Sequence, residues 1–290
     1  NIVSSQWVAV GLNSNTVRNI IAFDNRLFAA TTEGVYVTEM NDKYAWKPIN
    51  TGLGNLSVFT LLPVENTLFA GTKDGVYTLA SGAETWIAKR KGIPENNRVY
   101  TLLKHQQILY GGSAAGIFTS SDNGENWTLQ KNGFSGEPYV YALAAHENTV
   151  YAGTQEAGIK KTTDNGNSWQ DISTGLALPV TVGTFKVVSG RLLAGTDGAA
   201  GLYYLDQATS QWKPDNTGLT TPRVFTIIPT PIGKLYACSA NCVFSKEPKG
   251  EGWEKITTEG LPPGINFNNI SIVNKQLYVC TDKGIYWLKN

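Results

Sequence analysis

Aromatic and arginine side chains recur at matching places in this chain, at the start of short apolar segments. Aromatic rings stack on sugar rings or on peptide side chains, and arginine adds recognition of carboxylates. Together these residue types predict a surface that binds a ligand. The candidate ligand-binding residues are Arg18, Phe59, Arg98, Tyr100, Tyr139, Tyr141, Arg223 and Phe225.

Acidic residues offer a second chemistry, glycoside hydrolysis by two carboxylates. Such a mechanism needs a carboxylate pair about 5 Å or about 6.5–9.5 Å apart, and sequence spacing cannot place any two of the candidates at those separations. Acids in Thr-x-Asp-Gly-like turns usually serve the turn itself, so a structural role is expected for them. The acids are Glu33, Asp74, Glu156, Asp197 and Asp282.

Sequence patterns typical of metal sites or of catalytic nucleophiles are weak in this chain. Both histidines, His105 and His146, fall in turns predicted on the face opposite the aromatic residues and in different repeats. A histidine metal site or a Ser-His-Asp triad on the ligand face is therefore not expected. No glycine-rich loop follows a strand and opens a helix, so we expect no phosphate-binding loop and no cofactor.

Regularly spaced tryptophans indicate the repeated structural units that carry these residues. Seven tryptophans stand 39, 40, 41, 42, 43 and 41 residues apart, and each is followed within a few residues by Gly and then Leu, Ile or Phe. A period near 40 is typical of one four-stranded blade of a β-propeller. The series consists of Trp7, Trp46, Trp86, Trp127, Trp169, Trp212 and Trp253.

Each repeat contains short β-branched and aromatic runs separated by Gly, Asn and Asp. The third repeat shows three such strands most clearly, at 99–103, 108–112 and 117–119, before a fourth at 127–130. Runs of this kind indicate antiparallel hairpins, and no segment has a sustained 3.6-residue apolar period. Small residues in the second strand are expected to let neighbouring blades approach closely.

The chain ends complete the count. The last repeat stops after its third strand at Asn290, while residues 6–12 form a fourth strand without a blade. Pairing the two pieces would remove exposed sheet edges. The expected fold class is therefore an all-β, seven-bladed β-propeller with four antiparallel strands per blade, closed by the N-terminal strand, and residues 1–290 are expected to form a single domain.

The composition and net charge limit the classes of partner that are expected. With 24 basic and 23 acidic side chains the net charge is +1, and no basic run stands out. Nucleic acid is therefore not an expected partner. No apolar run approaches 18 residues, so no membrane insertion is expected. The chain begins at Asn1, which fits a processed or trimmed chain and leaves any signal peptide outside view.

Three cysteines leave two interpretations open. Cys238 and Cys242 bracket a three-residue turn and could face each other across a hairpin as a disulfide. Alternatively both are reduced thiols, an interpretation that also explains Cys280, which occupies the matching strand position one repeat later without a partner.

Two turns carry the pattern Ser/Thr-x-Asp-x-Gly-x-x-Trp, at 120–127 and 162–169. In each, the Asp is expected to accept backbone hydrogen bonds and the Gly to take positive φ, while the Trp anchors the outer strand. The pattern resembles the Asp-box, or bacterial neuraminidase repeat, of sialidases, other glycosidases, sortilin-type receptors and photosystem II assembly factors. Its residues, expected to be structural, are Asp122, Gly124, Trp127, Asp164, Gly166 and Trp169.

The resemblance implies a sialidase-type alternative, in which Arg18, Arg98 and Arg223 grip a carboxylate and Tyr100 or Tyr141 is the nucleophile. Sialidases of this resemblance have six blades, however, and these arginines do not occupy equivalent positions. The repeat also resembles exported bacterial propellers of unknown function. We therefore expect a non-catalytic, secreted, periplasmic or cell-surface propeller that binds a glycan or a protein or peptide. A glycoside hydrolase or lyase is the first alternative, and an assembly factor or scaffold the second.

Overall fold

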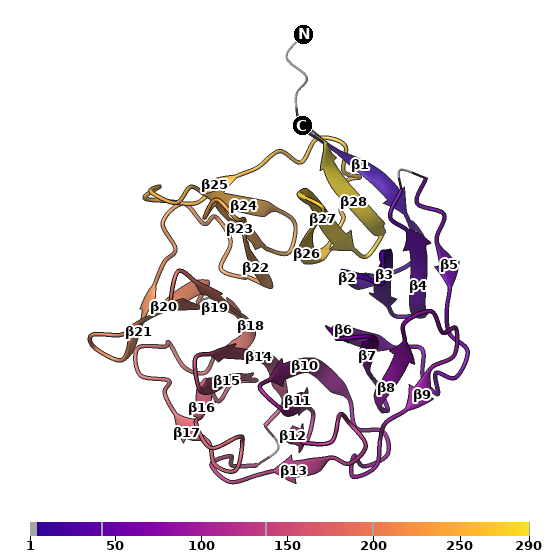
Figure 1. The fold of residues 1–290 in the computed structure, drawn as a ribbon. Coiled ribbons are helices and arrows are strands. Elements are labelled where there is room, and N and C mark those ends of the chain that lie inside the picture. Colours follow the sequence, from indigo (N-terminus) through magenta and orange to yellow (C-terminus); the bar gives the residue numbers. More distant parts are fainter. Residues whose placement is uncertain (1–4, 42, 137, 199, 290) are drawn as a thin grey trace.

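The computed structural model describes residues 5–41, 43–136, 138–198 and 200–289. Seven four-stranded antiparallel sheets stand around a central axis, with the first strand of each nearest the centre (Figure 1). The predicted all-β, seven-bladed propeller is therefore confirmed. No segment of the described chain is helical, and none forms a helix that is long and apolar enough to cross a bilayer.

The first four blades follow the chain in order, each written from its inner to its outer strand. Blade 1 comprises β2 (Val17–Phe23), β3 (Arg26–Thr31), β4 (Gly34–Glu39) and β5 (Lys47–Pro48). Blade 2 comprises β6 (Val58–Val64), β7 (Thr67–Thr72), β8 (Gly75–Ala80) and β9 (Ile87–Ala88). Blade 3 comprises β10 (Val99–His105), β11 (Ile108–Ser113), β12 (Gly116–Ser120) and β13 (Thr128–Gln130). Blade 4 comprises β14 (Val140–His146), β15 (Thr149–Thr154), β16 (Ile159–Thr162) and β17 (Gln170–Asp171).

The remaining blades include the closing one. Blade 5 comprises β18 (Thr181–Val188), β19 (Arg191–Asp197), β20 (Leu202–Asp206) and β21 (Gln211–Pro214). Blade 6 comprises β22 (Thr226–Pro229), β23 (Leu235–Cys238), β24 (Val243–Lys246) and β25 (Glu254–Lys255). Blade 7 comprises β26 (Phe267–Val273), β27 (Gln276–Thr281), β28 (Gly284–Lys289) and β1 (Gln6–Gly11).

Ring closure joins the two ends of the chain as the sequence predicts. β1 pairs antiparallel with β28, placing Trp7 opposite Leu288, and Figure 1 shows the two strands side by side. Because the N-terminal strand completes the last blade, an edge that would otherwise be open to another chain is paired.

The repeating tryptophans join neighbouring blades. Six of the seven indoles donate an Nε1 hydrogen bond to a backbone carbonyl of the preceding blade, as Trp127 does to Lys89 O at 3.0 Å. Trp169 is the exception and donates within its own blade, to Gly166 O at 3.1 Å. Both of these indoles are 4% exposed. The regular tryptophan spacing therefore reflects a repeated contact between blades as well as a repeated strand.

Glycine in the second strand also serves the junction between blades. A Cβ added to Gly71 would lie 2.7 Å from Val99 O, and one on Gly195 would lie 2.6 Å from Val224 O. Real Cβ atoms do not approach a backbone oxygen so closely. The expectation that small residues here allow the blades to approach is confirmed.

The two Asp-containing turns form the expected hydrogen bonds. Asp122 Oδ1 accepts from the Asn126 backbone N–H at 2.9 Å and from the Ser120 hydroxyl at 2.8 Å. Asp164 Oδ1 accepts from the Ser168 N–H at 3.0 Å. Gly124 has a φ of +86°, a conformation that favours glycine. These contacts give both carboxylates a local structural use.

The cysteines are free, and the alternative of two reduced thiols describes them correctly. Cys238 pairs with Val243 across the hairpin, and the Ser239 N–H donates to Cys242 O. Because successive strand residues point to opposite faces, this register turns the two thiols to different sides of the sheet. Cys238 accordingly packs with Phe267 of blade 7, whereas Cys242 packs with Trp253. The possible Cys238–Cys242 disulfide is therefore not formed.

Candidate functional site

One irregularity recurs at the inner edge of six blades. The register between first and second strands shifts at the second residue of the first strand in five of these blades and at the third residue in blade 5, and each shift leaves one residue unpaired. Such a β-bulge bends the strand and redirects a side chain. The unpaired residues, one per blade, are Arg18, Phe59, Tyr100, Tyr141, Gly183 and Asn268.

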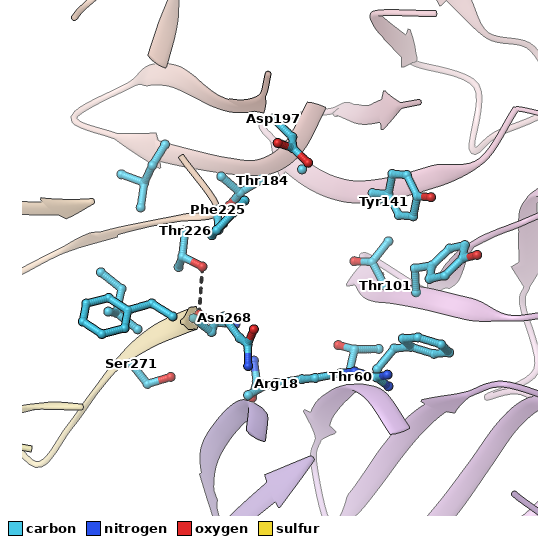
Figure 2. Close-up of a pocket in the computed structure, with 18 of the residues that line it drawn as sticks. Arg18, Thr60, Thr101, Tyr141, Thr184, Asp197, Phe225, Thr226, Asn268 and Ser271 are labelled. Carbon is cyan, nitrogen blue, oxygen red and sulfur yellow. Dashed lines mark hydrogen bonds between the residues drawn. The ribbon is translucent and has the colours of Figure 1, made fainter. Parts of the chain in front are cut away.

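These positions surround the central pocket, a cavity of about 950 Å³ lined by the inner strands of all seven blades. In blade 6, Phe225 takes the corresponding place immediately before β22. Figure 2 shows Arg18, Tyr141 and Asp197 around one open space, with Arg18 and Asp197 on opposite sides. Ligand sites commonly lie in such concave, partly apolar cavities.

Four rings form a continuous aromatic arc, which we define as Phe59, Tyr100, Tyr139 and Tyr141. Ring centroids lie 5.1 Å apart for Phe59 and Tyr100 and 4.7 Å apart for Tyr100 and Tyr141. Tyr139 lies 6.4 Å from both Tyr100 and Tyr141. These spacings lie within the range of favourable aromatic pairs, so the arc is a mutually supported surface across blades 2 to 4.

Arg18 extends the arc into blade 1. Its guanidinium carbon lies 4.2 Å from the centre of the Phe59 ring, and Nη1 donates to Ser57 Oγ and Val58 O, each at 3.0 Å. Burial lowers the pKa of Arg18, and the like charge of Arg98 lowers it further. Within the described residues no carboxylate forms an ion pair with either arginine. This side of the pocket is therefore cationic and favours an anionic group.

The opposite side differs because its charges are already paired. Arg223 Nε lies 2.6 Å from Asp197 Oδ1, in an ionic contact that lacks the alignment of a good hydrogen bond. Two further turn acids are also engaged: Asp74 accepts from Arg90 at 2.9 Å, and Asp282 accepts from the Asn266 backbone at 2.9 Å. Asp197 is the one carboxylate among the described residues that line the pocket.

Tyr141 is poorly placed to act as a nucleophile. Burial raises its pKa, and the neighbouring Tyr100 and Tyr139 raise it further. Its hydroxyl donates to Gln155 Oε1 at 3.0 Å, and a neutral amide does not take a phenolic proton. The surroundings of Tyr141 therefore favour the neutral phenol.

A polar ring lies next to the bulges, and sequence reasoning missed it. The residue that follows each bulged position carries a hydroxyl or an amide in six blades, and blade 4 has the buried Ala142 instead. Figure 2 shows several of these threonines around the space. The spacing of 41 to 43 residues could have revealed them. They are Asn19, Thr60, Thr101, Thr184, Thr226 and Asn269.

The structure brings most of the predicted ligand residues together. Arg18, Phe59, Tyr100, Tyr141 and Phe225 line the pocket. Tyr139 reaches the site through its ring contacts, whereas Arg98 and Arg223 are exposed residues outside the lining. The three arginines of the sialidase alternative are thus not equivalent, since Arg223 pairs with Asp197 while Arg18 stacks on Phe59.

The turn after the second strand and the segment before the first strand of a blade lie side by side. In blade 3 the Ala114 N–H donates to Arg98 O, and in blade 4 the Gln155 N–H donates to Tyr139 O. These bonds join the turn after the second strand to the segment before the first.

Among the described residues, no cluster of three or more His, Cys, Asp or Glu side chains is arranged to hold a metal ion.

Known structures share this ring architecture at low sequence identity. The extracellular domain of BT4673 from B. thetaiotaomicron matches with a TM-score of 0.81 at 15% identity, over 99% of this chain and 40% of that one. YCF48 bound to D1 peptide matches with a TM-score of 0.74 at 13% identity, over 99% and 96% of the two chains. AFV00434, an ancestral GH74 enzyme, matches with a TM-score of 0.73 at 19% identity, over 97% and 46%.

These similarities define the chain as a seven-bladed β-propeller and go no further, because propellers of one fold serve unrelated functions. The chain spans about 40% of the length of the BT4673 domain that it matches. No protein-family model matches the sequence, and no curated protein does.

Proposed function

We propose that this propeller binds a ligand in the central pocket without transforming it. The observation that carries the proposal is the aromatic arc, continued by the Arg18 guanidinium 4.2 Å from Phe59, at a cavity of about 950 Å³. Rings that already support one another lose little conformational entropy when a ligand stacks on them. The polar ring next to the arc supplies hydrogen bonds that orient the ligand.

The chemistry of the pocket favours binding over glycoside hydrolysis. A two-carboxylate mechanism needs a second acid near the first, and Asp197 alone lines the pocket among the described residues, in contact with Arg223. A tyrosine nucleophile needs a base, and Tyr141 has Gln155 as its partner. A glycoside hydrolase or lyase remains the alternative that a turnover assay would reveal.

A peptide segment of a protein partner is the ligand class we place first, with a glycan second. A propeller of the same fold has been solved with a peptide bound, which supports testing peptides, and a role as an assembly factor or scaffold would use the same surface. Stacking on the arc would equally suit a sugar ring.

The location that we propose is outside the cytoplasm. The extracellular domains among the structural neighbours support export to the periplasm, cell surface or medium. We take residues 1–290 as a single domain.

The test is a binding screen of the protein against peptide and glycan arrays, followed by affinity measurements with two variants. Tyr100→Leu removes the central ring of the arc. Tyr204→Leu is the matched control, because Arg191 stacks on Tyr204 at 4.1 Å outside the pocket lining. We expect Tyr100→Leu to weaken binding by roughly 30-fold or more, as for a hot-spot aromatic, and the control to bind normally. Equal affinity of both variants would place the ligand elsewhere.

A further inference from the structure

Blades 1 and 3 present the same local frame at the rim of the pocket. Val17 pairs with Thr31 in blade 1 as Val99 pairs with Ser113 in blade 3, and the bulged residue follows each valine. Three residues before the bulges stand Asn15 and Asn97, each only 7% exposed. The other five blades carry an apolar residue there, namely Leu56, Pro138, Val180, Pro222 and Ile265.

In blade 1 this buried amide has a carboxylate partner. Asn15 Nδ2 donates to Glu33 Oε2 at 3.1 Å and reaches the Tyr36 hydroxyl at 3.5 Å. Glu33 is held in its turn by its own N–H, which donates to Thr31 Oγ1 at 3.0 Å. A hydrogen bond to a charged acceptor is among the stronger ones in proteins, so Glu33 satisfies the amide well.

In blade 3 the turn is the same but the partner side chains are missing. Ala115 takes the place of Glu33, with its N–H donating to Ser113 Oγ at 3.1 Å, and Phe118 takes the place of Tyr36. Neither Asn97 Nδ2 nor Asn97 Oδ1 has a hydrogen-bond partner in the described part of the protein. Buried amides without partners are rare and destabilising. Blade 3 therefore has the donor of this pair without the acceptor.

The surroundings of Asn97 are cationic and aromatic. Arg98 follows directly, is exposed, and has no ion pair among the described residues. Its positive charge is close enough to Arg18 to disfavour the second guanidinium. Tyr100 of the aromatic arc stands three residues after Asn97. An anion placed here would relieve the repulsion between the arginines and give the amide an acceptor.

We propose that a carboxylate of the ligand occupies in blade 3 the place that Glu33 occupies in blade 1. It accepts a hydrogen bond from Asn97 Nδ2 and pairs with Arg98, while the adjoining part of the ligand stacks on Tyr100. This inference rests on the proposed function, with the ligand taken as a peptide. The carboxylate belongs either to an acidic side chain or to the peptide C-terminus.

The first experiment supplies the missing carboxylate from within the protein. Ala115→Glu copies blade 1, and Ala115→Gln is the uncharged control of matched length. We expect Ala115→Glu to weaken binding of acidic array peptides by roughly tenfold or more, the effect of losing one charged hydrogen bond. Ala115→Gln should bind within about threefold of wild type. Peptides with an amidated C-terminus, and peptides with Asp and Glu replaced by Asn and Gln, separate the two sources of the carboxylate.

A second measurement needs no known ligand, and its deciding result comes from the wild-type protein. Sodium acetate is titrated into wild-type protein while the Asn97 side-chain amide is followed by NMR, against sodium chloride at equal ionic strength. We expect a saturable shift with acetate alone, and its loss in Ala115→Glu and in Arg98→Ala. Absence of any acetate-specific shift in the wild-type protein would overturn the proposal.

The experiments distinguish failure of the proposed function from failure of the proposed carboxylate position. Peptide binding that is lost in Tyr100→Leu but equal in Ala115→Glu and Ala115→Gln would keep the central pocket as the site and overturn the carboxylate position. An acetate shift at Asn97 without binding of any array peptide would keep the carboxylate position and count against the peptide ligand.

Discussion

Gly92 and Trp127 meet backbone to backbone across the junction between blades 2 and 3. A Cβ on Gly92 would stand 1.9 Å from the Trp127 carbonyl oxygen, and the Trp127 N–H donates to Lys91 O at 2.8 Å. The same approach recurs between Gly52 and Trp86 and between Gly133 and Trp169. The recurring Trp and Gly of the sequence are therefore the two sides of one contact, made between successive blades.

Gly92→Ala should destabilise the propeller more than Gly82→Ala. Both glycines have positive φ, +92° and +75°, but no atom lies within 4 Å of a Cβ at Gly82. Each substitution incurs backbone strain of about 1–2 kcal/mol, and Gly92→Ala adds overpacking of about 1–3 kcal/mol. Urea unfolding of the two variants measures the difference, and equal losses would contradict a tight junction at Gly92.

Trp169→Ala should lower the free energy of unfolding by about 3–5 kcal/mol, because the indole is buried and the fold cannot fill the space. The side chain is 4% exposed, and its ring centroid lies 5.6 Å from that of Phe134. Thermal and urea unfolding provide the measurement. A melting temperature equal to that of wild type would show that Trp169 does not anchor its blade.

The Asp-containing turns should make stability depend on acid pH. Hydrogen bonds from the Asn126 side chain and backbone, and from Ser120, lower the pKa of Asp122 from 3.8 to about 2. Bonds from Ser168 and Thr162 lower that of Asp164 to about 2. A depressed folded-state pKa gives stability that is complete above the unfolded value and is lost as pH falls through the folded value.

The double variant Asp122→Ala/Asp164→Ala should therefore be less stable than wild type at pH 6. The difference should shrink between pH 4 and pH 2, the window set by these two pKa values. Urea midpoints across this range give the comparison. A difference that stays constant down to pH 2 would mean that the carboxylate charge has no part in the turn.

All three cysteines should be alkylated in the unfolded protein without any reductant, since Cys238 and Cys242 face opposite sides of their sheet. In the native protein, burial raises the pKa of Cys238 and Cys280 and keeps the reactive thiolate scarce. Both should then react slowly. Intact-mass analysis with and without denaturant checks both points, and a mass two hydrogens short would reveal a disulfide.

Tyr141 should remain a neutral phenol throughout the neutral range and ionise above 10, because burial raises its pKa above that value. The difference in ultraviolet absorbance between wild type and Tyr141→Phe, followed as pH rises, isolates this group. Ionisation near pH 7 would restore the case for a tyrosine nucleophile. Incubation with sialosides should release no product.

Much of the architecture could be read from the chain because the propeller is built from local hairpins. In blade 3 the first predicted strand, 99–103, lies within the observed Val99–His105, and the second, 108–112, lies within Ile108–Ser113. The closure by residues 6–12 followed from counting strands. Local turn residues and alternating strands carry this information, since each hairpin is specified by neighbours in sequence.

The amino-acid sequence by itself determined the number of blades, their order and the residue types near the axis. Only the tertiary structure decided what those residues do. The bulges bring Arg18, Tyr100 and Tyr141 to one cavity. Asp197 forms an ion pair with Arg223, and Asn97 lacks the hydrogen-bond partner that Asn15 has. The physical reason is that strand register and the contacts between blades join residues about 40 positions apart. No local pattern in the sequence specifies those distances.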